Sequence, residues 1–341
     1  MTTLTRAAMA AGIGYIGYRA LKRFREADLE GRVVLVTGAS RGLGFLLARR
    51  FADEGAKLVI CARDPDELSR ALDDLEERGA EVLAVPCDVT SQAEVEEMVA
   101  LATERFGHVD VLVNNAGIIQ VGPVESLRAE DFERAVDTMY LGTVYPTLAV
   151  LPQMIERGSG RIVNITSLGG FVSVPHLLPY SAAKFAAVGF SQGLRAELSR
   201  YGIPVTTVAP ATMRVGSYLH AEVRGEREAE YRWFSLLSSL PFVSTNPEHA
   251  ARAIVRASKR GDAVLFIGRR AMALAKLNGI APGLTADLLG IANRLLPSPV
   301  SDTAPTEPGW RVEERLRSRL HDVATGLGRR GAHKSHQYVA P

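Results

Sequence analysis

Short apolar runs alternate with longer stretches of helical periodicity along most of the chain. Continuous apolar runs are typical of parallel strands buried on both faces, and apolar residues three and four apart indicate amphipathic helices. The predicted strands cover Arg32–Thr37, Lys57–Ala62, Glu81–Pro86, Val109–Val113, Gly160–Thr166, Pro204–Val208 and Val264–Ile267. The predicted helices cover Phe45–Glu54, Asp66–Arg78, Gln92–Phe106, Glu130–Ile155 and Ser181–Arg200. This alternation predicts an α/β fold with a doubly wound parallel sheet and ligands at the carboxyl ends of the strands.

The segments outside this pattern divide the chain into three parts, residues 1–28, 29–270 and 271–341. Ala7 to Tyr18 is apolar and glycine-rich, with basic residues on both sides. Spanning a bilayer takes about 20 apolar residues, so this segment is short. Residues 7–25 are therefore a candidate helix at a membrane surface, and a signal peptide, a helix packed on the domain and disorder stay open as alternatives.

The carboxy-terminal extension has two helical patterns. Ala271 to Leu296 is apolar with helical periodicity up to a Pro-Ser-Pro break, and is interpreted as an extra helix over the substrate site, a membrane contact or a dimer element. Trp310 to Arg330 predicts a basic amphipathic helix. Gly331 to Pro341 is predicted to be disordered.

Composition and charge exclude several classes of protein. The 341 residues carry a formal net charge of +2, which gives no support for nucleic-acid binding. Cys61 and Cys87 are the only cysteines, so a disulfide framework and a zinc site built mainly of cysteine are excluded. Both are interpreted as buried thiols of predicted strands in a reducing, cytoplasmic protein. No spacing of ligand residues predicts a metal site.

Two glycine-rich stretches compete as nucleotide-binding turns. Gly12 to Gly17 reads G-x-G-x-x-G, but no strand precedes it, so we reject it. Gly38 to Gly44 lies between a predicted strand and a predicted helix. There, glycines let the backbone approach a pyrophosphate at the amino end of a helix, where free amides favour anions.

Tyr180 and Lys184 are four residues apart in a predicted helix and share one face. A neighbouring cation favours the phenolate and lowers the pKa of a tyrosine, which would make Tyr180 a general acid or base. Alone this pair is common by chance. The glycine turn upstream, in the expected order and at a domain's distance, strengthens the interpretation.

Four motifs in this order resemble the classical branch of the short-chain dehydrogenase/reductase family, a Rossmann-fold family. They are Thr37-Gly38-x-x-x-Gly42-x-Gly44, Asn114-Asn115-Ala116-Gly117, Ser167 and Tyr180-x-x-x-Lys184. The resemblance covers about Leu29 to Arg270. It implies one Rossmann domain, a small-molecule carbonyl or alcohol substrate, and a homodimer or homotetramer.

The resemblance also implies roles for individual residues. Ser167 would hydrogen-bond the substrate oxygen, Tyr180 would exchange a proton with it, and Lys184 would hold the nicotinamide ribose; Ser167 and Tyr180 thus bind substrate. The implied cofactor-binding residues are Gly38, Ser40, Arg41, Gly42, Leu43, Gly44, Arg63, Asp88, Val89, Asn115, Ala116, Gly117, Tyr180, Lys184, Pro210 and Thr212.

The end of the second predicted strand indicates the choice of cofactor. NAD enzymes usually place an acidic residue there, but this chain has Cys61-Ala62-Arg63. An arginine fork suits a 2′-phosphate, and Arg41 could add a second cation. NADP(H) is favoured, and Asp64 keeps NAD(H) open as the alternative.

Three residues depart from the family pattern. Met139 stands where many members carry an asparagine that helps hold a water for proton relay, and Ala211 and Val215 replace a usual glycine and threonine. The expected consequences concern cofactor geometry and turnover more than fold.

The predicted lid, Arg214 to Asn246, carries many large apolar residues: Tyr231, Trp233, Phe234, Leu236, Leu237, Leu240 and Phe242. With the apolar Leu168 to Pro179 loop it predicts a pocket for a bulky hydrophobic or lipid-like substrate, or else a lid packed onto the core. His176 and His220 lie near this region and are not interpreted as catalytic.

The predicted function is an NADP(H)-dependent oxidoreductase that interconverts a carbonyl and a secondary alcohol. The alternatives are a non-catalytic NADP-binding scaffold or redox sensor, and an enzyme acting on lipids at a membrane surface.

Overall fold

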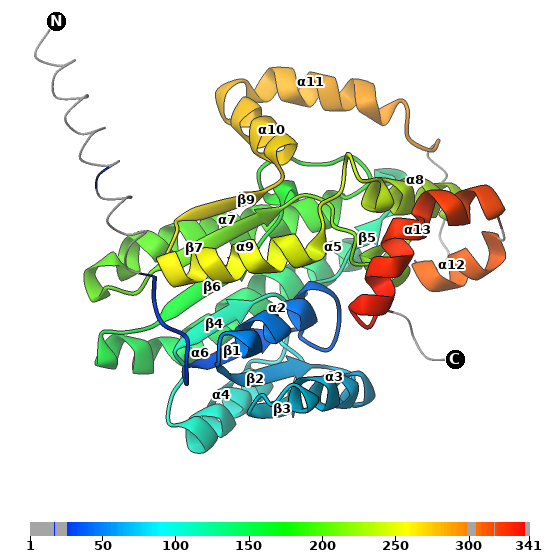
Figure 1. Cartoon of the computed structure of the whole chain (residues 1–341). Helices are drawn as coiled ribbons and strands as arrows, with labels where there is room; N and C mark the ends of the chain where they lie inside the picture. Colours follow the sequence, from blue (N-terminus) through cyan, green and yellow to red (C-terminus); the bar gives the residue numbers. More distant parts are fainter. Residues whose placement is uncertain (1–16, 18–25, 299–304, 317, 338–341) are drawn as a thin grey trace, which may run out of the picture.

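The computed structural model describes residues 17, 26–298, 305–316 and 318–337. Its centre is a parallel sheet of seven strands in the order β3-β2-β1-β4-β6-β7-β9 (Figure 1). The strands are β1 (Val33–Thr37), β2 (Lys57–Ala62), β3 (Val82–Pro86), β4 (Val111–Asn114), β6 (Arg161–Ile165), β7 (Val205–Pro210) and β9 (Val264–Ile267). The chain order reverses between β1 and β4, which is the switch point where doubly wound sheets bind ligands. The predicted fold class is confirmed.

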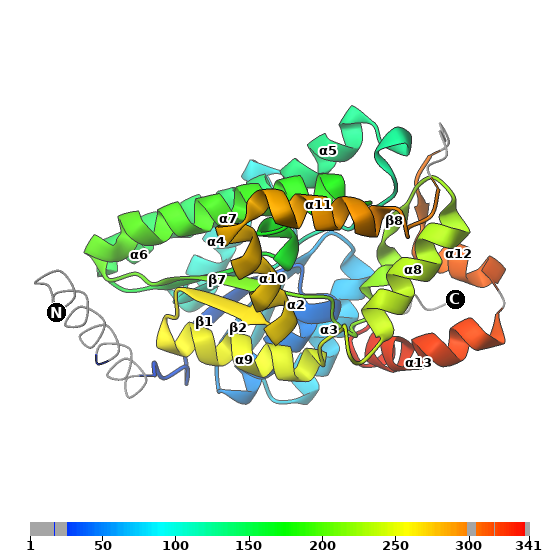
Figure 2. The same ribbon diagram turned by 90° about the horizontal axis from the view of Figure 1, so that it is seen from above.

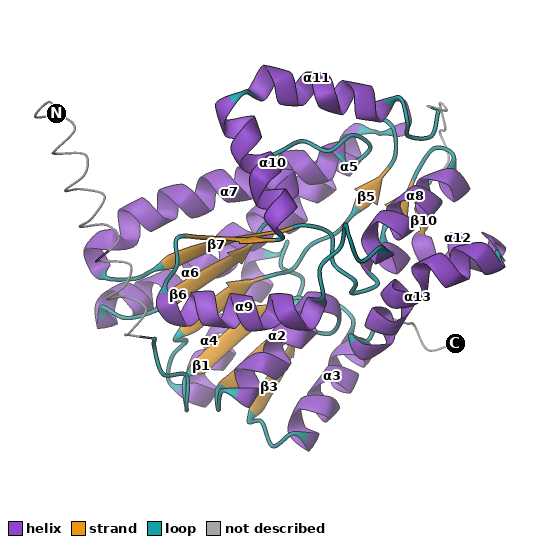
Figure 3. Cartoon of the chain, turned by 45° about the horizontal axis from the view of Figure 1, so that its top comes forward, coloured by secondary structure: helices purple, strands orange, loops and turns teal. Residues whose placement is uncertain are grey.

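Helices cover both faces of the sheet, so its inner strands are buried on each side, whereas the edge strands β3 and β9 are only partly buried (Figure 3). One core contains side chains from α2 (Gly42–Asp53), α3 (Pro65–Glu77) and α9 (Pro247–Arg260). The other contains side chains from α4 (Gln92–Phe106), α6 (Gly142–Arg157) and α7 (Leu178–Leu198). Burial on two faces explains why the strands are almost uniformly apolar in sequence.

The predicted helix Glu130–Ile155 consists of three consecutive pieces. They are α5 (Ala129–Val136), the π-helical turn η2 (Asp137–Leu141) and α6. Single π turns occur frequently at functional sites, and this one carries Met139. Cys87 lies one residue beyond β3 rather than inside it, and both cysteines are buried free thiols.

A second, three-stranded sheet lies beside the main one and was not predicted. It consists of β5 (Gln120–Val121), β8 (Glu222–Val223) and β10 (Glu307–Pro308), in the order β10-β8-β5. Strands of two residues are too short to leave a periodic signal. The sheet ties the region after β4 to the lid helix α8 (Arg227–Ser239) and to the carboxy-terminal extension.

The described residues of the extension form four helices where the sequence predicted two. These are α10 (Arg269–Ile280), α11 (Pro282–Asn293), α12 (Gly309–Leu316) and α13 (Arg319–Lys334). Pro282 occupies the first turn of α11, where a proline favours the start of a new helix. Figure 2 shows α12 and α13 beside α8, and both helices contact it.

The predicted disorder of Gly331 to Pro341 is wrong for residues 331–337. Helix α13 continues to Lys334 because its face with Thr325, Gly328 and Ala332 is buried. Ser335 and Gln337 are buried as well. Residues 338–341 lie outside the described part of the chain.

Short 3-10 turns complete the described elements: η1 (Val124–Ser126), η3 (Leu168–Gly170), η4 (Ser199–Tyr201) and η5 (Ser217–His220). The predicted membrane-contacting segment, residues 7–25, lies outside the described residues except for Gly17. Within the described residues, no helix is both long enough and apolar enough to cross a membrane.

Candidate active site

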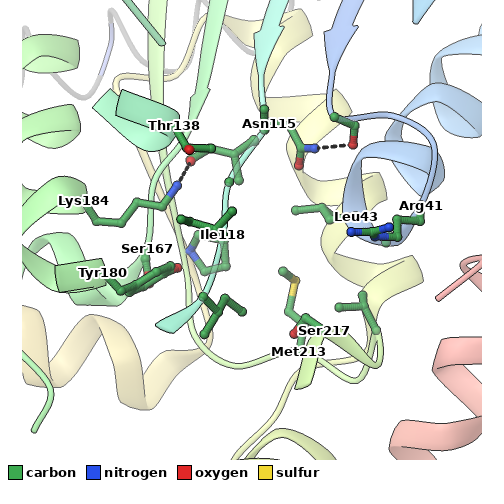
Figure 4. A pocket seen from close by; sticks show the side chains of 18 of the residues that line it. Arg41, Leu43, Asn115, Ile118, Thr138, Ser167, Tyr180, Lys184, Met213 and Ser217 are labelled. Atoms are coloured by element: carbon green, nitrogen blue, oxygen red, sulfur yellow. Dashed lines mark hydrogen bonds between the residues drawn. The ribbon is translucent and has the colours of Figure 1, made fainter. Parts of the chain in front are cut away.

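A cavity of about 1140 Å³ opens at the carboxyl ends of the central strands. Its walls come from the ends of β1, β2, β3, β4, β6 and β7, from α7, and from the lid. Figure 4 shows Arg41 and Leu43 of the glycine turn on one side and Ser167, Tyr180 and Lys184 on the other. Every predicted site residue lines this cavity except Gly44.

The glycine turn fits closely between β1 and β4. Gly38 has a φ of +63°, and a Cβ there would lie 2.8 Å from the Cα of Ala116. A Cβ on Gly44 would lie 2.2 Å from the carbonyl oxygen of Gly38, so Gly44 lets α2 pack onto the turn instead of facing the cavity. The N-cap of α2, Arg41, makes no side-chain cap. The amide of Gly42 donates to the carbonyl oxygen of Ser335 at 2.7 Å, and the rest of the first turn of α2 has no side-chain cap, which favours an anion there.

Asn115 joins the ends of β1 and β4. Its side-chain amide donates to the carbonyl oxygens of Thr37 at 2.9 Å and Gly38 at 3.0 Å. The Thr37 hydroxyl accepts from the backbone amides of Asn115 and Ala116 at 2.9 and 3.1 Å. These bonds hold the glycine turn in place. The side chain of Asn115 therefore contributes to the site by shaping the cavity wall (Figure 4).

The end of β2 gathers the charges that could select the cofactor. Asp64 caps α3, where one carboxylate oxygen accepts from the amides of Asp66 and Glu67 at 3.0 and 2.9 Å. Arg63 is exposed at the rim of the cavity and has no ion-pair partner among the described residues. Arg41 forms an ion pair with Glu67. Asp64 also lines the cavity, but one of its oxygens caps α3, so Arg63 is the charged residue here that an incoming anion would meet without a competing ion pair among the described residues.

Glu67, a residue that the sequence did not single out, holds both polar side chains of the glycine turn. It accepts from the Ser40 hydroxyl at 3.0 Å as well as from Arg41. An anion bound here would compete with this carboxylate for Arg41. The helical pattern of α3 alone gives no signal for that contact.

Asp88 and Val89 line the cavity beyond β3. One carboxylate oxygen of Asp88 accepts from the amide and the hydroxyl of Thr90, both at 2.9 Å, and so closes the turn before α4. The N-cap of α4 itself is Ser91, so Asp88 shapes the turn ahead of the helix and also has a place in the cavity wall.

The proposed catalytic side chains meet where β6 ends and α7 begins. Ser167 caps η3, and its hydroxyl accepts from the amide of Gly169 at 3.0 Å. Lys184 is buried and donates to the carbonyl oxygen of Ile165 at 2.9 Å. Its ammonium lies 5.9 Å from the ring centre of Tyr180. Three side chains of different chemistry thus face one end of the cavity.

Burial shifts the pKa of both titratable side chains in this cluster. Desolvation raises the pKa of Tyr180 above its ordinary value, although a hydrogen bond with the Ser167 side chain works in the opposite direction. Desolvation lowers the pKa of Lys184 to about 8. The net shift in the pKa of Tyr180 is opposite to the lowering expected from Lys184, because burial dominates. The phenol is therefore protonated at neutral pH, as a proton donor must be.

The family profile described as short chain dehydrogenase matches residues 32–225. The chain belongs to the short-chain dehydrogenase/reductase family. A Streptomyces coelicolor protein provisionally named a ketoacyl reductase is 45% identical over 186 residues, which are 54% of this chain and 71% of that protein. The family assignment and the prediction of an oxidoreductase acting on CH–OH or carbonyl groups are both confirmed.

Two solved structures of the family are similar to this chain. A variant of actinorhodin polyketide ketoreductase, solved with NADPH, is 34% identical with a TM-score of 0.61, over 70% of this chain and 95% of that one. A short-chain dehydrogenase/reductase from Burkholderia phymatum, solved with NAD, is 26% identical with a TM-score of 0.69, over 76% of this chain and 96% of that one. Both cofactors thus occur among relatives, and the family alone does not choose between them.

Met139, at the position where many family members have asparagine, is buried. It packs in a cluster with Ala135, Ala183 and Tyr180. The residue before it, Thr138, lines the cavity instead (Figure 4). The sequence identified the missing asparagine but not Thr138, because the π turn that sets its direction has no sequence signature.

The other two departures from the family pattern also lie in the wall. Ala211 and Val215 line the cavity together with Pro210 and Thr212. The backbone amide of Ala211 donates to the carbonyl oxygen of Ile267 at 3.1 Å, which fixes this stretch against β9.

The lid supplies part of the apolar lining of the cavity, with fewer residues than the sequence suggested. Phe234 and Leu237 of α8 line it. Tyr231 is buried in the core of the lid, whereas Phe242 is 80% exposed. The remaining apolar lining comes from outside α8 and includes Ile118, Leu168, Val174, Leu177, Val215, Val243 and Leu274. Both interpretations of the lid therefore apply, each to different side chains: some line the cavity and others pack in the core of the lid.

The two histidines have structural contacts. His176 Nδ1 lies 2.8 and 2.9 Å from the carboxylate oxygens of the buried Glu230, which fastens the loop before α7 to the lid. His220 contacts the carbonyl oxygen of Gln337 at 2.7 Å. Among the described residues, no group of histidine, cysteine and carboxylate side chains could hold a metal ion.

Proposed function

We propose that this protein is an NADP(H)-dependent reductase or dehydrogenase that interconverts a bulky hydrophobic ketone and its secondary alcohol. One observation carries the proposal. A single cavity joins the exposed Arg63 at the end of β2 to Ser167, Tyr180 and Lys184 at the start of α7. NADP(H) carries its 2′-phosphate on the adenosine half and its reactive ring at the other end, with the pyrophosphate between them, and this cavity offers matching chemistry at each end.

The chain's own residues fit such a cofactor. Gly38 lets the glycine turn pack against Ala116, and the backbone of the turn lies in the cavity wall where a pyrophosphate could approach it. Arg63 could bind a 2′-phosphate without first breaking an ion pair to any described residue. Arg41 would have to leave Glu67 before it could bind the phosphate. The nicotinamide ring, when bound, supplies or accepts the hydride.

Proton transfer would be carried out by the side chains at the end of the cavity opposite Arg63. Tyr180 holds its proton at neutral pH and would donate it to the oxygen of the reduced carbonyl. Ser167 would hydrogen-bond the same oxygen and hold it beside the phenol. Lys184 would favour the transient phenolate electrostatically, since an ammonium inside a poorly solvated site acts more strongly than one in water.

The substrate class rests on the apolar half of the cavity. Leu177, Phe234, Leu237 and Leu274 line it from three different parts of the chain. Such a wall favours a bulky hydrophobic or lipid-like substrate. The names of two relatives, a ketoacyl reductase and a polyketide ketoreductase, describe substrates of related character.

Titration of the purified full chain with NADPH and NADH, followed by nicotinamide fluorescence, tests the cofactor. We expect NADPH to bind more tightly and Arg63→Ala to remove most of the difference. A screen of hydrophobic ketones with NADPH then tests the chemistry, with Tyr180→Phe as the control. Equal binding of both dinucleotides to the wild type would overturn the NADP(H) assignment, and turnover retained by Tyr180→Phe would overturn the role of the phenol.

The predicted cytoplasmic location, the membrane contact through residues 7–25 and the homodimer or homotetramer remain proposals. Fractionation of the full chain against one lacking residues 1–28 tests the contact, and equal partitioning of the two would remove it. Light scattering measures the oligomeric state.

A further inference from the structure

The last described residues of the chain, Ser335 to Gln337, lie between the glycine turn and the lid. The carbonyl oxygen of Ser335 accepts from the backbone amide of Gly42 at 2.7 Å. The Ser335 hydroxyl donates to the carbonyl oxygen of Val215 at 2.9 Å. These residues, called here the tail clasp, therefore bind both walls of the cavity.

Gln337 is the member of the tail clasp that enters the cavity. It lines the cavity, and only 6% of its surface is exposed. Its backbone is fixed on both sides: its amide donates to the carbonyl oxygen of Ala332 at 3.0 Å, and its carbonyl oxygen lies 2.7 Å from His220 Nε2. A fixed backbone leaves the side chain little freedom.

The side-chain amide of Gln337 lies directly against the glycine turn. A Cβ added to Gly42 would meet Gln337 Nε2 at 2.5 Å. The amide oxygen of Gln337 is buried and has no hydrogen-bond partner among the described residues. Buried side-chain amides are normally fully paired, so this amide beside the glycine turn has hydrogen-bonding capacity that the described residues do not use, which points to a ligand.

His336, between Ser335 and Gln337, has an unfavourable backbone conformation. Its φ is +55°, in the left-handed region that few side chains adopt. Its ring stacks on Phe45 of α2 with the ring centres 4.0 Å apart. Strained backbone of this kind persists where the surroundings enforce it, and it gathers at ligand sites.

We propose that Gln337 binds the dinucleotide, with its side-chain NH₂ group donating to a phosphate oxygen at the glycine turn. This inference rests on the proposed function. The amide of Gly42 would ordinarily be available to an anion at the start of α2, but here it is bonded to Ser335. Gln337 Nε2 supplies a replacement donor at the same place. The tail clasp thus occupies the backbone amide of Gly42 and offers the side-chain amide of Gln337 in its place. It also links the lid to the bound cofactor.

The test compares full-length variants by fluorescence titration with NADPH, a binding measurement that needs no turnover. We expect Gln337→Ala to raise the Kd by about tenfold, the effect of losing one hydrogen bond to a charged group. Gln337→Glu should raise it further, because a carboxylate repels the phosphates. Leu320→Ala is the matched control, since Leu320 is 85% exposed near the start of α13 and should leave the Kd unchanged.

Hydrogen exchange of the full chain gives a second measurement. We expect NADPH to slow exchange in peptides that cover residues 38–45 and 335–337 together. Faster exchange in the tail clasp, or tighter NADPH binding by Gln337→Ala, would overturn the inference and mean that the tail competes with the cofactor. A wild type that binds NADPH no better than Gln337→Ala would overturn it and leave the proposed function intact. A wild type that binds neither dinucleotide would overturn the proposed function and this inference with it.

Discussion

Lys184 should destabilise the folded protein at neutral pH. Its ammonium is buried, and desolvation lowers its pKa from 10.5 to about 8. The charged form is therefore less favourable in the folded state than in the unfolded one. At 1.36 kcal/mol per unit of pKa, this difference between the folded and unfolded states lowers the free energy of unfolding by about 3 kcal/mol. The full penalty applies well below pH 8, where Lys184 is charged in both states.

The pH dependence separates this effect from others. As the pH rises from about 8 towards 10.5, folded Lys184 loses its proton before the unfolded residue does, so the penalty falls. Between pH 7 and 9 the wild type should gain about 1 kcal/mol relative to Lys184→Met. The methionine variant also leaves the carbonyl oxygen of Ile165 without its donor, but that loss does not change with pH.

The assay is urea denaturation of the wild type and Lys184→Met at pH 7, 8 and 9. Lys276→Met, at an exposed position of α10, is the matched control and should show no such trend. The reasoning fails if the free-energy difference between the wild type and Lys184→Met is constant over this range. The variant should also lose at least about a hundredfold in turnover, since the phenolate loses its electrostatic partner.

Three further substitutions test separate parts of the site. Tyr180→Phe should lower kcat by about a hundredfold or more while the Kd for NADPH, measured by fluorescence, stays the same. Glu67→Gln should lower the Kd for NADPH about fivefold and leave the Kd for NADH almost unchanged. It frees Arg41 and removes a carboxylate from the phosphate site, an effect of about 1 kcal/mol. An unchanged ratio of the two Kd values in paired titrations would argue against that site. Phe234→Ala should raise KM for bulky ketones about tenfold in steady-state assays and leave small ketones unaffected.

The sequence predicted the parts of this protein whose physics is local. Strands such as β1 and β2 are apolar at nearly every position because both faces of the sheet are covered. The glycine turn was recognisable because a strand precedes it and a helix follows. Since parallel strands all end at one edge, residues far apart in sequence, such as Arg63 and Tyr180, could be expected in one site.

What the sequence could not predict depends on contacts between distant segments. Glu67 belongs to an ordinary amphipathic helix, and only the folded chain brings it to Arg41. The rise in the pKa of Tyr180 comes from burial, which outweighs the local signal of a lysine one turn away. Gln337 follows a polar, glycine-containing segment that resembles a disordered tail, and its order comes from α13 and the glycine turn.

Groups held in unfavourable states gather around the cavity. Among the described residues other than glycine, His176 and His336 have a positive φ, at +61° and +55°. His176 is held by Glu230 and by a bond from the amide of Gly122 to its carbonyl oxygen, and His336 by stacking on Phe45. One shapes the loop before α7 and the other the tail clasp. A fold selected for stability alone would relax these positions and replace Lys184 by an apolar residue, so their concentration here is what a site built to position a ligand requires.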